Sequence, residues 1–587
     1  MLAQDPDVLH SDGGALTTSV SVPAERLERG PKGHRVHVID YDASANLFYR
    51  ARDNEVESDP YAKVSDVEKL IRDPHFHQQN VYAIAMATLC EFEGALGRPV
   101  GWGFSEASHQ LKISPHAFAD ANAYYSRESE SLNFGYFPRE DGQTVFTCLS
   151  HDIVVHETSH ALLDGLRPYY FKPSSTDQAA FHEGFSDVVA LLSVFRSEEI
   201  IREALRSLMT KNLRISLDRL TLDGLGSTSL ARLAEQMGAA LEGVPSSALR
   251  ESLKIKPDRS HYTSARFEEE HDRGELLVAV IMRAFMMTWL SRLQPHREGQ
   301  PAGLHAGIVA EEGATAARQL LRICIRALDY LPPVDLTYPD YVSALLTADM
   351  QLYPDDDKYH YRKVLKETFA AYGIDPASRD RSDGAWNPPC EDDFSMVGVH
   401  FERMQRDPTE VFRFIWENES FASTPADDGR PITLFRPRKL GEARRKSPYH
   451  PDPMVTHVVV TLVRRRHAKS DQYLPLVDDS GKVISARVSL YGKKTWPYAR
   501  ALCTEFLAAP REQRKPALEI TESGKTILVR VPEGESFSLL IFPDGDPATI
   551  GRQHAFGEQR LFKALQRASY NLVANRAKSI AVAAAKC

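Results

Sequence analysis

The stretch Val154–Leu166, VVHETSHALLDGL, places two histidines four residues apart with a glutamate directly after the first. On a helix, positions i and i+4 lie one above the other on one face, so His156 and His160 can direct ring nitrogens at the same ion. Glu157 then lies beside that ion. In a chain with 21 histidines, chance gives this pattern on the order of a few per cent of the time, so the predicted metal-binding helix needs further support.

The segment from 179 to 195, AAFHEGFSDVVALLSVF, supplies a third metal ligand. A zinc hydrolase takes three protein ligands and keeps a fourth position for water. Glu183 and Asp187 are four residues apart on this predicted helix, so Glu183 can bind zinc while Asp187 accepts the second ring N–H of His156. The alternative is two acidic residues on a solvated face, but the helix is otherwise apolar from Val188 to Phe195. His182 competes as the ligand, yet its spacing of five from Asp187 favours Glu183.

These two segments resemble the thermolysin-like family of gluzincin metallopeptidases, in which H-E-x-x-H is followed about twenty residues later by E-x-x-x-D. Here 22 residues separate His160 from Glu183. The resemblance covers about residues 75–375. It implies an α+β fold, with a catalytic domain that has a mixed α/β N-terminal half and a mainly helical C-terminal half. It also implies zinc as the cofactor and a peptide or protein as the substrate.

Two further segments extend the resemblance. DANAYYSRESESLNFGYFP, residues 120–138, is similar to the family's edge segment, which implies that Asn122 and Ala123 hold the substrate backbone as an added strand. EEEHDRGELLVAV, residues 268–280, is similar to the segment that carries a histidine on the oxyanion side, which implies that role for His271. The orienting partner is one of the glutamates at positions 268, 269 and 270. A surface histidine at a helix start is the alternative for His271.

The remaining family positions have weaker counterparts. SSALRESLKIKPDRSHY, residues 246–262, looks like the segment whose arginine binds a substrate carbonyl, and it nominates Arg250. A tyrosine that helps to bind the oxyanion follows the zinc helix in the family, and Tyr169 and Tyr170 fall near that distance. A helix-surface arginine and ordinary core or surface tyrosines are the alternatives.

The implied activity is that of a zinc-dependent metalloendopeptidase. Zinc lowers the pKa of a bound water toward neutrality, and Glu157 takes the proton of that water and passes it to the leaving amine. One rival hypothesis is a zinc aminopeptidase, although no Gly-x-Met-x-Asn motif precedes the zinc helix. Another is a peptidase fold that serves as a scaffold or autoprocessing module. In that case the C-terminal domain binds an anionic partner through the basic stretch from Arg436 to Lys469.

The composition is that of a soluble protein with reduced thiols. The chain has 587 residues, of which 42% are apolar and 26% charged, and its net charge of −9 gives no reason to expect nucleic acid as a partner. The cysteines form no C-x-x-C pair, which favours a reducing compartment. They are Cys90, Cys148, Cys324, Cys390, Cys503 and Cys587. The N-terminus shows no export signal, so we expect a cytoplasmic protein, with non-classical export left open.

The chain length and its breaker residues predict several regions. Residues 1–34 are expected to form a loose tail, and residues 35–375 the metallopeptidase domain. Residues 376–454 are expected to be an irregular connection, and residues 455–587 a smaller α+β domain of unknown role. The most apolar run, Leu276–Leu290, contains Arg283 and is too short to span a bilayer, so no membrane is expected. The oligomeric state stays open.

Overall fold

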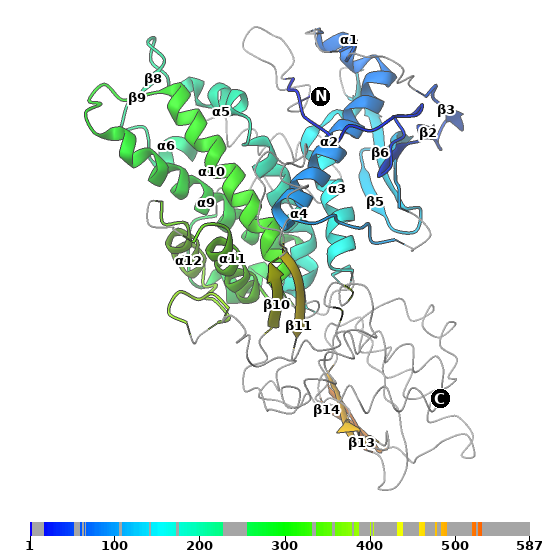
Figure 1. Ribbon diagram of the computed structural model, residues 1–587, viewed down its shortest axis with the longest axis vertical. Coiled ribbons are helices and arrows are strands. Elements are labelled where there is room, and N and C mark those ends of the chain that lie inside the picture. The colour runs from blue at the N-terminus through cyan, green and yellow to red at the C-terminus, as the bar shows by residue number, and fades with distance from the viewer. Residues whose placement is uncertain are drawn as a thin grey trace.

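The computed structural model combines helices and strands (Figure 1). It describes residues 1–2, 17–51, 59–61, 64, 66–104, 109–139, 143–168, 170–171, 175–226, 255–331, 336–354, 359–378, 381–386, 400 and 403, and the strands 431–437, 457–463, 476–477, 483–489, 519–523 and 526–530. The mixture agrees with the expected α+β class. A sheet occupies the N-terminal part, and a group of helices follows it along the chain.

A five-stranded sheet forms the N-terminal part. Its strands are β1 (Val36–Val38), β4 (Leu111–Phe118), β6 (Ser131–Pro138), β5 (Ala123–Ser126) and β7 (Thr144–Phe146). The strands β1, β4 and β6 are parallel, whereas β5 and β7 both run antiparallel to β6. In β4, Leu111 and Ile113 are buried while the residue between them is half-buried, which is the two-residue period of a strand. The order β1-β4-β6-β5 leaves β5 at the edge.

Short elements flank the sheet. The strands β2 (Tyr41–Asp42) and β3 (Leu47–Phe48) pair antiparallel, and α1 (Val67–Ile71) precedes the long helix α2 (Pro74–Leu96). Asp73 caps α2 by accepting a hydrogen bond from the His75 N–H, with Pro74 at the first helical position. The cap and the proline explain why the helix begins at Pro74.

Two helices lie between the sheet and the helical part. These are α3 (His151–Leu166), reached through the short helix η1 (Thr147–Leu149), and α4 (Thr176–Val194). The helix α3 packs against α2, β5 and α4, and α4 packs in turn against α9 (Glu270–Arg297), as Figure 1 shows. Both predicted metal-binding segments are therefore helices at the centre of the domain.

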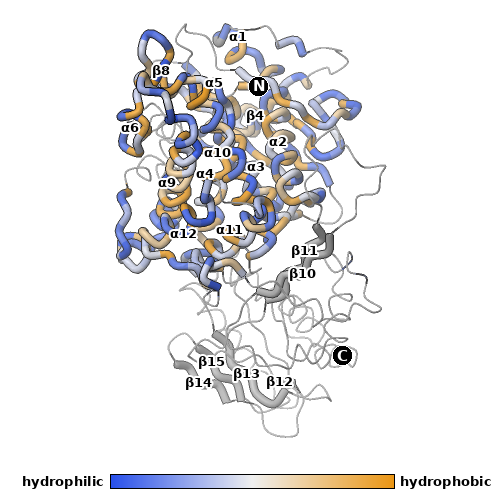
Figure 2. The backbone as a smooth tube through the Cα atoms, turned by 60° about the vertical axis from the view of Figure 1, so that its left-hand side comes forward, coloured by the Kyte–Doolittle hydropathy of each residue, from blue (hydrophilic) through white to orange (hydrophobic). Residues whose placement is uncertain are grey.

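The rest of the domain is mainly helical, as the pattern predicts. Its elements are α5 (Glu198–Ala204), η2 (Leu205–Leu208), β8 (Arg214–Ile215), α6 (Leu222–Gly226), η4 (His261–Thr263), η5 (Ala265–Phe267), β9 (Leu304–His305), α10 (Ala306–Ala327), η6 (Leu328–Tyr330), α11 (Tyr338–Leu352) and α12 (Tyr361–Ala371). Figure 2 shows apolar residues concentrated along the helices and polar residues along the connecting loops. Among the described helices, α9 alone is long and apolar enough to cross a membrane, but 72% of its apolar window is buried in the fold, as in a core helix.

The N-terminal segment differs from the expected loose tail. Leu2 is 1% exposed, and its N–H donates to Asn80 on α2. Farther on, Glu25 accepts hydrogen bonds from the hydroxyl of Tyr82 and the N–H of His34. The described residues of this segment therefore contact α2. The polar composition of the segment does not reveal these contacts, because the partner side chains are distant in sequence.

The C-terminal part contains two small groups of strands. The strand β10 (Pro431–Pro437) pairs antiparallel with β11 (His457–Val463), so a strand lies inside the region 376–454 that was expected to be irregular. A second sheet has the order β12 (Leu476–Val477), β13 (Val483–Ser489), β15 (Thr526–Arg530), β14 (Glu519–Ser523). The strands β11 to β15 lie within residues 455–587, which were expected to form a smaller α+β domain. Most of that region lies outside the described residues.

Candidate metal centre

The helix α3 buries an unusual number of polar side chains. Asp152, Glu157, Thr158, Ser159, His160 and Asp164 are all buried along it. Thr158 and Ser159 satisfy their hydroxyls by donating to backbone carbonyls one turn earlier, at 2.6 and 2.7 Å. Asp152 accepts a hydrogen bond from the Ser150 hydroxyl, and Asp164 accepts from Tyr125 and Arg127. Glu157 and His160 remain, and burying such groups is costly unless they are paired or bind an ion.

Three side chains from α3 and α4 converge. His156 Nε2 and His160 Nε2 lie 2.8 Å apart, and Glu183 Oε2 lies 3.5 and 3.6 Å from these two nitrogens. The helical spacing of the histidines and the packing of α4 on α3 produce this group. Two imidazole nitrogens and a carboxylate oxygen are donors that zinc takes in catalytic sites. The structure thus brings the three predicted ligands together.

The Nδ1 nitrogens of His156 and His160 have different partners. His156 Nδ1 lies 2.8 Å from the Asp187 carboxylate, one turn beyond Glu183 on α4. A carboxylate only accepts, so His156 carries its ring proton on Nδ1 and turns the lone pair of Nε2 toward the other ligands. This is the contact predicted from the spacing of the two acidic residues.

His182 is a site residue whose role the sequence did not reveal. Its Nδ1 lies 2.6 Å from His160 Nδ1, and the two rings stack with centroids 4.7 Å apart. Ser186 Oγ lies farther from the same nitrogen of His160, at 3.2 Å. His182 is therefore not a fourth ligand but the acceptor that orients His160. The sign of this role in the sequence is the position of His182 directly before Glu183, on the same turn of α4.

Glu157 lies within the fold, 7% exposed. Burial raises the pKa of its carboxyl group, while the charges of His160 and His156 and a backbone hydrogen bond from Tyr125 on β5 oppose the rise. A glutamate with a raised pKa suits a group that takes up a proton and releases it near neutral pH. The hydrogen bond from Tyr125 also places the Glu157 carboxylate against the edge strand β5.

The charges of the cluster balance one another. For Glu183, burial favours a higher pKa, but the charge of His160 and hydrogen bonds from both histidines hold the pKa well below its usual range. For His156, burial favours a lower pKa, but Asp187 and Glu183 raise it well above the ordinary value. The cluster therefore favours a positive charge between the rings and the carboxylate, and a divalent cation provides that charge without a proton.

His271 lies in the first turn of α9, half-exposed, with its Nδ1 3.0 Å from Glu269 Oε1. Of the three candidate glutamates, the structure therefore selects Glu269, which also caps α9 through the His271 N–H. Burial favours a lower pKa for His271, but the hydrogen bond that its ring donates to Glu269 and the charges of Glu269 and Glu183 raise it. The helix α9 packs against α4 where Gly184, next to Glu183, meets Gly274, one turn after His271.

The edge strand β5 runs beside α3. Asp164, on the turn after His160, accepts hydrogen bonds of 2.8 Å from Tyr125 Oη and Arg127 Nε, and these bonds join the strand to the metal-binding helix. Ala123 begins β5, and the Asn122 side chain accepts a hydrogen bond from the Ala123 N–H. The strand therefore has a fixed position against α3, and among the described strands it pairs only with β6, which is the arrangement that an added peptide strand requires.

The structure does not bring Tyr170 to the cluster. Tyr170 is 1% exposed and packs edge to face on Phe181 in the hydrophobic core, so it is not presented to a substrate. Tyr169 and Arg250 lie outside the described residues.

Comparison with known proteins adds no family: neither a protein-family model nor a curated protein sequence matches this chain.

Proposed function

We propose that this protein is a zinc-dependent metalloendopeptidase with a thermolysin-like catalytic domain. The proposal depends on one observation, the convergence of His156 Nε2, His160 Nε2 and Glu183 Oε2 from two packed helices, with Glu157 buried on the same helix as the histidines. A buried pair of histidines with a carboxylate is also compatible with a purely structural ion. The open edge strand and the half-exposed His271 beside the cluster favour a site that admits a substrate.

The donor set fits zinc on its chemistry. Neutral imidazole and carboxylate are zinc ligands, and the outer contacts to Asp187 and His182 fix the tautomers that binding requires. His156, His160 and Glu183 would hold the ion. When bound, zinc supplies a water of lowered pKa and polarises the carbonyl of the scissile bond.

The protein residues then have separate roles. Glu157 takes a proton from the attacking water and later delivers it to the leaving amine, which its raised pKa favours. His271, oriented by Glu269, donates to the oxyanion that forms on the substrate carbonyl. The β5 edge holds the peptide as an additional antiparallel strand, so that the scissile bond lies next to α3.

Replacing the proposed base separates metal binding from chemistry. We expect Glu157→Gln to retain zinc and to lose cleavage of a blocked peptide library, because the amide cannot take up the proton. We expect His160→Ala to lose zinc as well. The measurements are zinc content by mass spectrometry and product formation from peptides blocked at both ends, which an aminopeptidase does not cleave.

The control is Glu68→Gln, which changes an exposed glutamate on α1 and should leave zinc content and the cleavage rate unchanged. Cleavage by Glu157→Gln at the wild-type rate would refute the role of Glu157. Activity on free N-termini alone would replace the endopeptidase by an aminopeptidase.

A further inference from the structure

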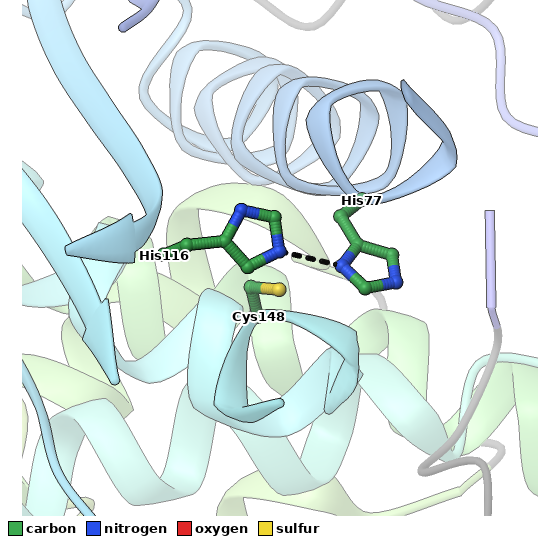
Figure 3. A group of neighbouring side chains, drawn as sticks. All are labelled: His77, His116 and Cys148. Atoms are coloured by element: carbon green, nitrogen blue, oxygen red, sulfur yellow. Dashed lines mark hydrogen bonds between the residues drawn. The ribbon is translucent and has the colours of Figure 1, made fainter. Parts of the chain in front are cut away.

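Three side chains that the proposed peptidase chemistry does not use meet near the start of α3. His77 comes from α2, His116 from β4 and Cys148 from η1, and each is at most 1% exposed. His77 Nδ1 lies 2.8 Å from His116 Nε2, and the Cys148 Sγ lies within 4.8 Å of both nitrogens. Figure 3 shows the two ring nitrogens facing each other with the sulfur beside them.

The contacts on the far sides of the rings fix both tautomers. His77 Nε2 lies 2.9 Å from the Ile71 carbonyl oxygen, and His116 Nδ1 lies 2.9 Å from the Asp40 carboxylate. Both partners only accept, so each of these nitrogens carries the ring proton. In the neutral rings the two facing nitrogens are therefore bare lone pairs at hydrogen-bond distance. Such a contact is repulsive unless a positive species lies between the rings.

A proton on His116, which Asp40 would pair, satisfies the two facing nitrogens alone. It leaves the Cys148 thiol, buried beside them, without a role.

A metal ion of the zinc type satisfies all three groups. Imidazole nitrogen and thiolate sulfur are ligands that zinc prefers, and the ligating histidines of such sites donate their other N–H to a carboxylate or a backbone carbonyl. Both kinds of acceptor are present. We propose that His77, His116 and Cys148 form a second metal site, which binds a divalent ion of the zinc type and is separate from the cluster on α3 and α4.

The charges at this position support a divalent ion. Binding releases one proton from the Cys148 thiol, so the thiolate contributes one negative charge. The Asp40 carboxylate, held by a 2.9 Å hydrogen bond from Gln78 Nε2, contributes the other. Together they balance the two positive charges of the ion in a place where an unbalanced charge would be costly.

The position of the site indicates a structural role. Its ligands come from α2, β4 and the short helix directly before α3, so one ion would join the sheet to the start of the helix that carries His156. All three side chains are closed off from solvent, which leaves no access for a peptide. The site would hold α3 in place without taking part in hydrolysis.

Cobalt substitution distinguishes this site from the first one. A thiolate bound to cobalt(II) absorbs in the near ultraviolet by charge transfer, whereas the first cluster has no sulfur donor. We expect the full-length protein, loaded with cobalt after removal of zinc, to show this band and to bind two cobalt ions per chain. His160→Ala should lose one ion and keep the band. Cys148→Ser should lose one ion together with the band.

The matched control is Cys324→Ser, because Cys324 is equally buried but belongs to no metal-ligand group among the described residues. It should keep both ions and the band. If Cys148→Ser does not fold, the wild-type spectrum alone still decides.

A wild-type protein with cobalt bound but no thiolate band would overturn the proposal and leave a hydrogen-bonded histidine pair. A visible thiolate-to-copper charge-transfer band after copper loading, without zinc retention, would assign the same ligands to copper instead of zinc. Failure of the first cluster to bind metal would not affect the band, so the two proposals fail independently.

Discussion

At the scale of the residue, the two histidines of α3 differ in what holds them. His156 donates to a carboxylate, whereas His160 can donate only to the ring of His182 or, at a longer distance, to a serine hydroxyl. For His160 Nε2 to offer its lone pair, His182 must be neutral and carry its proton on Nε2. Burial, followed by the charge of His160, lowers the pKa of His182 well below its usual range and keeps the ring neutral. That buried Nε2 has no hydrogen-bond partner among the described residues.

This arrangement predicts that zinc binding depends on a hydrogen-bond acceptor at position 182 more than on an imidazole ring there. We expect His182→Leu to weaken zinc binding by about 10- to 100-fold, because His160 loses the partner that fixes its tautomer. His182→Asn supplies a carbonyl acceptor in a smaller side chain and should bind zinc with nearly the wild-type affinity. Competition with a chelator of known affinity measures both. Equal dissociation constants for His182→Leu and the wild type would show that His182 does not orient His160.

The residue scale also shows what a sequence can predict about a site. The pairs His156/His160 and Glu183/Asp187 were predictable because each lies within one helix, where i and i+4 share a face. The role of His182 depends on how α4 crosses α3, and the choice of Glu269 among three consecutive glutamates depends on the cap of α9. The local periodicity of a sequence encodes neither the angle at which two helices cross nor the cap of a helix.

At the scale of the element, α4 and α9 meet at a pair of glycines. A methyl group on Gly184 would lie 2.9 Å from the Gly274 carbonyl oxygen, whereas a methyl group on Gly274 would have no contact shorter than 3.4 Å. The close approach follows from the missing side chains. Gly184 follows the ligand Glu183 directly, and Gly274 is one turn after His271, so this crossing sets the distance between the ligand and the proposed oxyanion donor. In the sequence alone, a glycine inside a helix indicates only a loss of helix propensity.

The different space around the two glycines predicts opposite effects when each is replaced by alanine. Gly184→Ala must push α9 away, and we expect a loss of about 1–3 kcal/mol in the free energy of unfolding from overpacking. It should also lower kcat/KM by about 100-fold, because a shift of about 1 Å misplaces His271. Gly274→Ala has room for its methyl group, so activity should be retained and stability should rise by up to about 1 kcal/mol. Urea denaturation and peptide cleavage measure both variants, and similar behaviour of the two would contradict the crossing argument.

At the scale of the whole molecule, the class of the fold was predictable, whereas the long-range contacts were not. The helices α3 and α4 were predictable because the period of a helix is local. The packing of residues 17–34 on α2 depends on Glu25 finding Tyr82, 57 positions away, and a polar segment gives no sign of such a partner. The same holds for the contact that joins the sheet part to the helical part, the ion pair of Arg98 and Asp329.

This ion pair connects residues 231 positions apart. Arg98 follows α2 and donates to both carboxylate oxygens of Asp329 in η6, at 2.6 and 2.5 Å. Asp329 is almost fully buried, with a side chain that is 3% exposed. Removing Arg98 leaves the buried Asp329 carboxylate with the more distant Arg326, at 3.5 Å, so Arg98→Ala should lower the free energy of unfolding by about 3 kcal/mol at pH 7. The exposed pair of Arg259 and Asp375 provides the control, and Arg259→Ala should cost less than about 1 kcal/mol.

The pH dependence of this loss tests its electrostatic origin. Burial favours a higher pKa for Asp329, but the charge and hydrogen bonds of Arg98, together with Arg326, hold the pKa below its usual value. A carboxyl group whose pKa is lower in the folded than in the unfolded state stabilises the fold fully above the unfolded pKa of about 3.9, and this stabilisation disappears as the pH falls through the folded pKa. The difference between the wild type and Arg98→Ala should therefore be constant from pH 7 to about pH 5 and shrink below about pH 4. Urea titrations across this range measure it. A difference that stays the same in acid would mean that Arg98 acts through packing and not through its charge.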